Sequence, residues 1–406
     1  MVTTLKVIDD DQIQTIRETA LELLNTTGVA IMEPRARRFF QDAGASVDEE
    51  NKRVRMPPDF VMAALKNVPS RFTVHARLPE NDIEVDYQRL HIEPMIGRIN
   101  IIDLDTGERR RTNLEDVGNL IRVADAMENF HLLHSGAIMP SIEGVPLHAS
   151  HAYGYLTSLR NTGKVVKCSP RGRATAEDCI RMAAVLAGGE DALRKRPNTF
   201  TTVNPVTPLL HDQGQTEGLL EYASYGLPVD VTSEPQAGAT APVTLAGLLT
   251  QQTADVISGI VLAQLVNPGT PVWYGTCGTI MDMKVGRIAL GAVEAGLINA
   301  ASAQIASSFS IPCRGTGATT DSKLLDVQAG YEKAITLFMA ALGGINCLFY
   351  PGAMESALSI NLESLVIDNE ICGMAFRALE GIQVNPETLS SSPSYMNLKL
   401  IGKFPS

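Results

Sequence analysis

Residues 228–232 read Pro-Val-Asp-Val-Thr and residues 271–275 read Pro-Val-Trp-Tyr-Gly, with the long apolar stretch 242–266 between them. The two short segments are rich in β-branched and aromatic residues and each begins at a proline, which is typical of buried strands. The middle segment is too long for a strand and predicts a helix. A strand, a helix and a second strand of these lengths form one βαβ unit, in which the two strands are parallel.

The same alternation extends in both directions along the chain and occurs eight times. The predicted strands are 98–103, 130–135, 164–168, 199–203, 228–232, 271–275, 311–314 and 345–350. The predicted helices are 114–128, 149–162, 174–186, 213–225, 242–266, 285–308, 323–341 and 362–379. Eight units predict an α/β protein with a (β/α)8 TIM barrel. An open doubly wound sheet would normally carry a G-x-G-x-x-G turn after its first strand, and that turn is missing here.

The first 95 residues lack this rhythm and predict a small α-rich N-terminal cap. Apolar residues at helical spacing predict helices at 10–25, 34–43 and 57–66, and short β-rich runs predict strands at 72–74 and 83–85. We therefore expect three parts: the cap at 1–95, a barrel catalytic domain at 96–386 and a divergent C-terminal tail at 387–406.

Composition excludes several classes of function. The chain has 406 residues, a formal net charge of -11 and a pI near 5.2, so it offers no basic face to nucleic acid or to anionic membranes. No uninterrupted apolar run approaches about 18 residues and the first ten residues do not resemble a signal peptide, so we expect a cytoplasmic protein. The six cysteines form no C-x-x-C pair and all seven histidines lie at or before His211, so we predict no metal site.

In a barrel of this kind the chemistry gathers at the carboxyl ends of the strands. Small residues and hydroxyls dominate these ends, and carboxylates are too few for a paired-acid hydrolase. Three glycines, Gly275, Gly315 and Gly317, would let a large flat group approach closely and are the predicted cofactor-binding residues. They could equally make only tight turns. Asn204 and Glu234 also end strands, and we predict that they bind substrate.

Aromatic and basic residues at the strand ends suggest what that substrate is. Tyr274 and Tyr350 are the predicted mouth residues of two aromatic pairs, and aromatic faces attract quaternary ammonium groups. Arg314 suits a carboxylate. The alternatives are that the tyrosines only pack and that Arg314 forms an ion pair with Asp321 or Glu332.

Several longer runs are similar to the trimethylamine methyltransferase family. They are Leu245-Ala-Gly-Leu248, Pro312-Cys-Arg-Gly315, Thr320-Asp-Ser-Lys323, Gln328-Ala-Gly-Tyr-Glu332 and Val366-Ile-Asp-Asn-Glu-Ile-Cys-Gly-Met374. The resemblance covers nearly all of residues 1–386. It implies a (β/α)8 barrel that moves a methyl group from a methylated amine to the cobalt of a separate corrinoid protein. It therefore implies a corrinoid-protein partner and no tightly bound cofactor, and we also expect a homo-oligomer.

The resemblance is closer to one branch of that family. Methylamine members carry pyrrolysine in the segment that matches 314–323, where this chain has standard residues, so it resembles the branch that demethylates quaternary amines such as glycine betaine. Glycine betaine members have histidine at the position of Tyr350. We predict Tyr350 and Glu332 as catalytic residues. Family members usually continue several tens of residues beyond the position of Pro386.

Two other classes of function stay open at this stage. One is a non-catalytic paralogue that binds a betaine or a corrinoid protein. The other, a phosphate-binding barrel lyase, is disfavoured because the sequence shows no lysine at a strand end that could form a Schiff base.

Overall fold

The computed structural model describes residues 5–97, 100–135, 144–168, 171–386 and 388–389. The predicted cap helices are confirmed: the cap contains α1 (Asp10–Thr26), α2 (Pro34–Asp42) and α3 (Pro58–Leu65). Asp9 and Gln12 form a capping box that starts α1, because each side chain satisfies the backbone N–H of the other residue. A small sheet accompanies the helices, in the order β12 (Leu210–His211), β1 (Val29–Ile31), β3 (Arg53–Arg55) and β2 (Ser46–Asp48).

Parallel strands form the centre of the protein. Six of them pair in the order β11 (Thr201–Val203), β13 (Val229–Ser233), β15 (Val272–Thr276), β18 (Cys313–Thr316), β19 (Cys347–Phe349) and β6 (His91–Glu93). A separate parallel pair contains β10 (Val165–Lys167) and β9 (Leu132–His134). Backbone hydrogen bonds join this pair to both edges of the larger sheet: His131 donates to Ile92 at 2.9 Å, and Cys168 donates to Phe200 at 3.1 Å.

The prediction that 98–103 is the first strand of the parallel set is wrong. Its described residues form β7 (Asn100–Ile102), which pairs with β8 (Arg109–Arg111) and β21 (Ser359–Ile360) in another sheet that β20 (Ala353–Met354) completes. The position beside β19 belongs to β6, within the segment expected to be cap. β6 reads His-Ile-Glu, and all three residues are buried. Its two polar residues do not fit the apolar pattern expected of a buried strand, so the sequence did not predict it.

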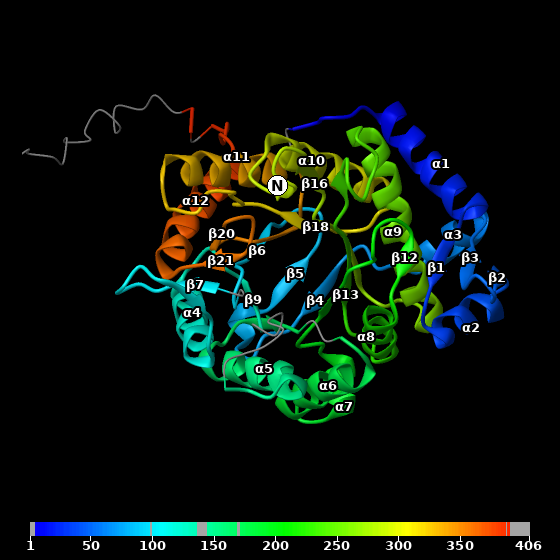
Figure 1. Ribbon diagram of the computed structural model, residues 1–406, viewed down its shortest axis with the longest axis horizontal. Helices are drawn as coiled ribbons and strands as arrows, with labels where there is room; N and C mark the ends of the chain where they lie inside the picture. Colours follow the sequence, from blue (N-terminus) through cyan, green and yellow to red (C-terminus); the bar gives the residue numbers. More distant parts are fainter. Residues whose placement is uncertain (1–4, 98–99, 136–143, 169–170, 387, 390–406) are drawn as a thin grey trace, which may run out of the picture.

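Helices surround the strands as a ring, with α1, α2 and α3 lying outside α9 (Figure 1). The ring contains α4 (Leu114–Ala126), α5 (Ser150–Asn161), α6 (Arg173–Ala187), α8 (Gln213–Ser224), α9 (Leu245–Val266), α10 (Val293–Ser308), α11 (Val327–Gly343) and α12 (Leu362–Glu380), with the short α7 (Glu190–Lys195) beside α6. α9 has the length and apolar composition of a membrane span, but 72% of its most apolar window is buried within the protein. It packs against α1 and α8 as a core helix.

Helix α10 begins eight residues later than the sequence pattern predicts. The preceding residues instead form β17 (Arg287–Ala289), which pairs with β16 (Thr279–Asp282) and through it with β14 (Gln236–Ala237). These strands follow β13 and β15, so they extend the loops at the carboxyl ends of the central strands.

The opposite end of the strands is closed by a hairpin of β4 (Phe72–Val74) and β5 (Ile83–Val85), both at their predicted positions. The hairpin packs against interior side chains of the parallel strands, among them Phe200 and Trp273. Measured between ring centroids, Trp273 lies 4.6 Å from Phe72 and 4.9 Å from Phe200. The carboxyl ends of the strands are therefore the end at which a site can open.

Candidate functional site

Four charged side chains meet in the interior, one from each of four parallel strands. Arg314 on β18 donates to Asp230 on β13 at 2.7 Å and to Glu93 on β6 at 2.5 Å. Lys167, the last residue of β10, forms an ion pair with Glu93 at 2.9 Å. All four side chains are at least 96% buried, and Arg314 and Asp230 are fully buried. We call these residues the interior charge network; two are cationic and two anionic, so the network is balanced.

Burial and pairing act against each other on these groups. Burial alone would raise the pKa of Glu93, but the charges of Arg314 and Lys167 outweigh it and hold that pKa below its usual range. Burial would lower the pKa of Arg314, whereas Glu93 and Asp230 raise it above its ordinary value. Burial, aided by repulsion from Arg314, lowers the pKa of Lys167. Pairing therefore outweighs burial in its effect on the pKa of Glu93 and of Arg314, whereas burial outweighs pairing at Lys167.

Hydroxyl groups and one glycine complete the network. Thr202 and Thr232 donate to Asp230 at 2.9 and 2.8 Å. A side chain at Gly275 would overlap Thr232 and Asp230. Gly275 was predicted to admit a cofactor, but the space in front of it is filled by these two residues.

An aromatic stack lies over the network. The guanidinium carbon of Arg314 is 3.9 Å from the centroid of the Phe349 ring, and that ring lies 4.6 Å from the Tyr350 ring at an interplanar angle of 31°. Phe349 and Tyr350 belong to a buried apolar cluster with Met95, Cys277 and Leu290. Met95 follows β6, Cys277 follows β15 and the aromatic pair lies at the end of β19, so the cluster lies at the carboxyl ends of these strands, and Leu290 joins it from the position directly after β17. Tyr350 thus directly follows a strand, as predicted, and its role at the barrel mouth stays a prediction.

Tyr350 has an unusual backbone conformation. Its φ is +101°, in the region that favours glycine. Its hydroxyl accepts a hydrogen bond from the Cys277 thiol at 3.6 Å, and 8% of the residue is exposed. Strained backbone of this kind persists where the surroundings enforce it and often marks a functional site.

Two predicted substrate-binding residues meet across the site. The Asn204 amide donates to the Glu234 carboxylate at 3.1 Å and to the Thr232 carbonyl at 3.0 Å. Asn204 is half-buried and Glu234 is exposed. They give the carboxyl ends of β11 and β13 a polar rim, opposite in character to the apolar cluster around Tyr350.

The expected orientation of Tyr274 is wrong. Tyr274 is fully buried, and its hydroxyl hydrogen-bonds Thr253 at 2.9 Å and Gln252 at 3.4 Å, both on α9. Of the pair 273–274 it is Trp273 that faces the interior, at the closed end. Strand alternation was the right argument, but the sequence did not show which of the two faces pointed inward.

The other two glycines also serve packing. A side chain at Gly315 would overlap Asn299 on α10, and one at Gly317 would lie about 3 Å from Leu337 and Leu348. These two positions therefore let strand β18 and the loop after it approach the surrounding structure closely. The cofactor-binding role expected for them lacks the open space on which it depended.

Glu332 lies on α11 and hydrogen-bonds the loop that contains Thr320 and Asp321. Its carboxylate accepts hydrogen bonds from the Thr320 hydroxyl at 2.6 Å, the Asp321 amide at 2.9 Å and the Gln328 side chain at 2.9 Å. Asp321 in turn accepts from the Leu290 amide at 2.9 Å. The ion pairs expected between Arg314 and these two carboxylates are wrong, because Arg314 binds Glu93 and Asp230. The catalytic role of Glu332 stays a prediction.

Three members of the network were not predicted from the sequence: Glu93, Lys167 and Asp230. His134, the last residue of β9, was not predicted either, and it is fully buried. Leu132 packs in the interior cluster, and side chains two apart on a strand face the same way, so His134 faces the interior as well. The available signal was a charged or imidazole side chain inside or at the end of an apolar strand. Because Lys167 ends β10, the lyase alternative can no longer be disfavoured on the ground that no lysine ends a strand.

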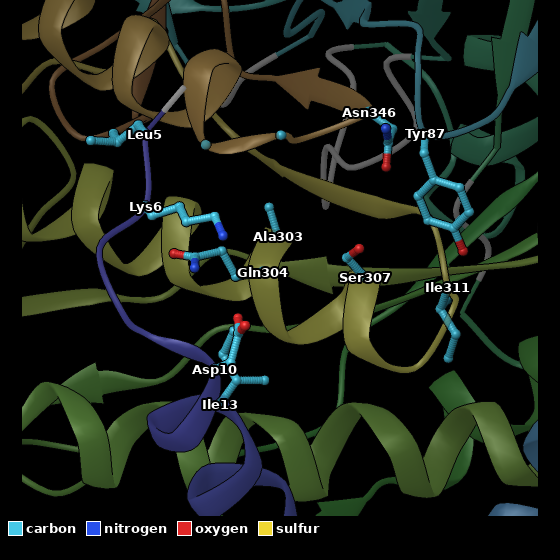
Figure 2. A pocket seen from close by; sticks show the side chains of 12 residues that line it. Leu5, Lys6, Asp10, Ile13, Tyr87, Ala303, Gln304, Ser307, Ile311 and Asn346 are labelled. Atoms are coloured by element: carbon cyan, nitrogen blue, oxygen red, sulfur yellow. The ribbon is translucent and has the colours of Figure 1, made fainter. Parts of the chain in front are cut away.

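A cleft lies at the other end of the strands. This cleft of about 270 Å³ is lined by Lys6 and Gln304 on one side and by Tyr87, Ser307 and Asn346 on the other (Figure 2). Asn346 directly precedes β19, so the cleft is at the end opposite Tyr350. In the described part of the chain, no group of three His, Cys, Asp or Glu side chains is placed to hold a metal ion.

Comparisons with known proteins agree on one family. Residues 1–399 match the model of the trimethylamine methyltransferase family, a match that runs past Pro386, where the resemblance was expected to end. Glycine betaine methyltransferase of Desulfitobacterium hafniense strain Y51 is 36% identical over 92% of this chain and 78% of its own length. Trimethylamine methyltransferase of Methanosarcina thermophila is 33% identical over 95% of this chain and 80% of its own length.

Solved structures agree on the fold. The crystal structure of the Methanosarcina barkeri monomethylamine methyltransferase superposes with a TM-score of 0.57 over 92% of this chain and 82% of that protein, at 15% identity. At this identity the likeness concerns the fold alone.

Proposed function

Because this chain belongs to the trimethylamine methyltransferase family, we propose that it transfers a methyl group from a quaternary amine of the betaine type to Co(I) of a corrinoid protein. Its relatives are named as methyltransferases of glycine betaine and trimethylamine, so a methyltransferase acting on a small amine is supported. The betaine and the corrinoid acceptor are our proposals.

The cluster around Tyr350 is the observation that carries this proposal. A quaternary ammonium needs apolar and aromatic surface for its methyl groups and cannot donate a hydrogen bond. The face of Tyr350, with Met95 and Cys277 beside it, supplies such a surface at the carboxyl ends of the strands. Cation–π attraction to one ring contributes about 0.5–2 kcal/mol.

The proposed chemistry makes few demands on proton transfer. Co(I) attacks the methyl carbon, the carbon–nitrogen bond breaks, and nitrogen leaves with the electron pair as a neutral tertiary amine. No proton moves in this step. What the chain must supply is alignment of methyl, nitrogen and cobalt together with exclusion of water, and alignment alone can contribute roughly 7–11 kcal/mol. The buried, balanced charges below Phe349 leave the aromatic face as the surface that positions the cation.

The test mixes the protein with Co(I)-cobalamin and a panel of betaines and follows the Co(I) absorbance. We expect the absorbance to decay with at least one betaine at a rate that depends on protein concentration. If the Co(I) absorbance decays with none of the betaines, the proposal is contradicted. Calorimetric binding of a betaine without any methyl transfer would favour the non-catalytic paralogue.

Three accompanying expectations belong to the same proposal. We propose that the parallel strands close into a (β/α)8 barrel, since backbone hydrogen bonds already join the β9–β10 pair to both β6 and β11. We also propose that the protein acts in the cytoplasm. A homo-oligomer stays a prediction, which analytical ultracentrifugation would test.

A further inference from the structure

We propose that Lys167 binds the carboxylate of the substrate and thereby selects zwitterionic betaines over quaternary amines that carry no anionic group. This inference rests on the proposed function. It replaces Arg314 in the role that the sequence suggested for it.

A zwitterionic substrate needs a cation as well as an ammonium-binding face. The described residues of the central parallel strands include one arginine, Arg314, and one lysine, Lys167. Arg314 cannot serve, because its side chain is fully buried and both terminal nitrogens already bind carboxylates. The Phe349 ring also covers its guanidinium.

Lys167 is less enclosed than Arg314, whose side chain is fully buried. Its ammonium carries three hydrogens, and the ion pair with Glu93 engages one of them. Glu93 keeps Arg314 as a second partner at 2.5 Å, so it stays paired if Lys167 turns partly toward a ligand. Lys167 ends β10, its side chain retains 4% exposure, and its long stem lets the point charge move.

The spacing fits a short zwitterion. The Lys167 ammonium lies 5.8 Å from the Phe349 ring centroid, which lies 4.6 Å from that of Tyr350. The Lys167 nitrogen and the Tyr350 ring are therefore at most roughly 10 Å apart. A cation–π contact spans up to about 6 Å and a charge-assisted hydrogen bond about 2.8 Å. A betaine, whose two charges lie a few ångströms apart, is therefore long enough to bridge a separation up to this limit.

The experiment compares two substrates and two variants, with Co(I)-cobalamin as acceptor. Glycine betaine carries a carboxylate, and tetramethylammonium does not. We expect Lys167→Met to raise KM for glycine betaine by about 10- to 100-fold, the effect of losing a charge-assisted hydrogen bond. kcat/KM for tetramethylammonium should stay within about threefold of the wild-type value. Equal losses for both substrates would show a structural role and overturn the inference.

Lys164→Met is the matched control. Lys164 lies three residues earlier, and its ammonium donates to the Ala124 and Met127 carbonyls. KM for glycine betaine should be unchanged in this variant, and a comparable rise would overturn the assignment to Lys167.

Two further measurements keep the inference testable if Lys167→Met does not fold. Lys167→Gln can still donate to Glu93 but carries no charge, and we expect the same selective loss. In the wild type, glycine betaine should bind more tightly than tetramethylammonium by calorimetry, and equal affinities would overturn the inference. If the wild type binds betaine through Lys167 but transfers no methyl group, the proposed function fails and the inference survives.

Discussion

Tyr350 combines an aromatic face with a backbone conformation that tyrosine rarely adopts. If this face holds the ammonium group, Tyr350→Ala should weaken binding of a betaine by about 0.5–2 kcal/mol. Isothermal titration calorimetry measures the change. Tyr331 on α11 is 59% exposed, so Tyr331→Ala should bind betaine like the wild type. A similar loss in both variants would mean that Tyr350 does not contact the ligand.

Arg314 is held by two buried carboxylates, so its role is structural. Arg314→Met would leave Asp230 without a cationic partner and Glu93 with Lys167 alone, and breaking a buried ion pair costs about 3–5 kcal/mol. We expect a loss of that size in the free energy of unfolding, measured in urea. Arg377 is largely exposed, so Arg377→Met should change stability by less than about 1 kcal/mol. An unaltered stability for Arg314→Met would contradict the role assigned here.

Asp255 on α9 should make the stability depend on pH. Burial raises its pKa from 3.8 to about 7, although the Leu209 amide and the Ser233 hydroxyl both donate to it. A carboxyl whose pKa is higher in the folded state stabilises the fold fully below its unfolded pKa. That stabilisation is lost as the pH rises toward about 7.

The neutral variant Asp255→Asn removes this titration. Between pH 4 and pH 7 the wild-type free energy of unfolding should fall relative to that of Asp255→Asn, by at most about 1.4 kcal/mol per pH unit. Urea titrations at several pH values measure the difference. Parallel pH profiles for the two proteins would show that Asp255 does not titrate in this range.

At the scale of elements, the helices were predictable and one strand was not. The cap helices and most helices of the ring show strong apolar periodicity and lie within a few residues of their predicted bounds. β6 is short and carries histidine and glutamate, so its burial depends on partners contributed by β10 and β18, far along the chain. Local pattern cannot reveal a strand whose polar residues are satisfied only by tertiary contacts.

Gly275 on β15 leaves room for the side chains of Thr232 and Asp230 in the interior. Gly275→Ala would push a methyl group into Thr232 and Asp230, and overpacking of this kind costs about 1–3 kcal/mol. Thermal unfolding followed by circular dichroism should show a lower Tm. Gly330, on α11, has open space around its Cα, so Gly330→Ala should instead stabilise the protein by about 0.5–1 kcal/mol. Equal effects at the two sites would argue against the steric explanation.

At the scale of the whole molecule, the sequence identified residues that lie at the carboxyl ends of the strands but not the charged side chains of the interior network. Tyr350, Asn204 and Glu234 could be named because they directly follow strands. Lys167 and Asp230 lie inside strands, where only the direction of alternation separates the interior from the helix side. Which side chains of a strand point to the interior depends on how the hairpin β4–β5 and the helices pack against that strand. The sequence of a single strand does not contain this information.

The N-terminal segment before α1 is held at Val7 and Ile8 by Gln304 on α10, and at Leu5 by a backbone hydrogen bond to the Leu342 carbonyl at 3.2 Å. The Gln304 amide accepts from the Val7 backbone at 2.9 Å and donates to the Ile8 carbonyl at 2.7 Å, beside the cleft of Figure 2. α1 is held separately, by apolar packing on α9 and by a hydrogen bond from Arg17 to the Ser308 carbonyl of α10 at 2.8 Å. Gln304→Ala should therefore release Val7 and Ile8 without releasing α1.

Hydrogen exchange can separate these two attachments. In Gln304→Ala, the Val7 amide should exchange much faster than in the wild type, whereas amides of β13 keep their protection, because local opening need not involve the core. The free energy of unfolding should fall by only about 1–3 kcal/mol, the sum expected for two or three hydrogen bonds. Gln14 lies on the exposed side of α1 and donates to Glu18 there, so Gln14→Ala should leave the exchange of Val7 unchanged. Retained protection of Val7 in Gln304→Ala would mean that packing, and not this amide, holds the segment against α10.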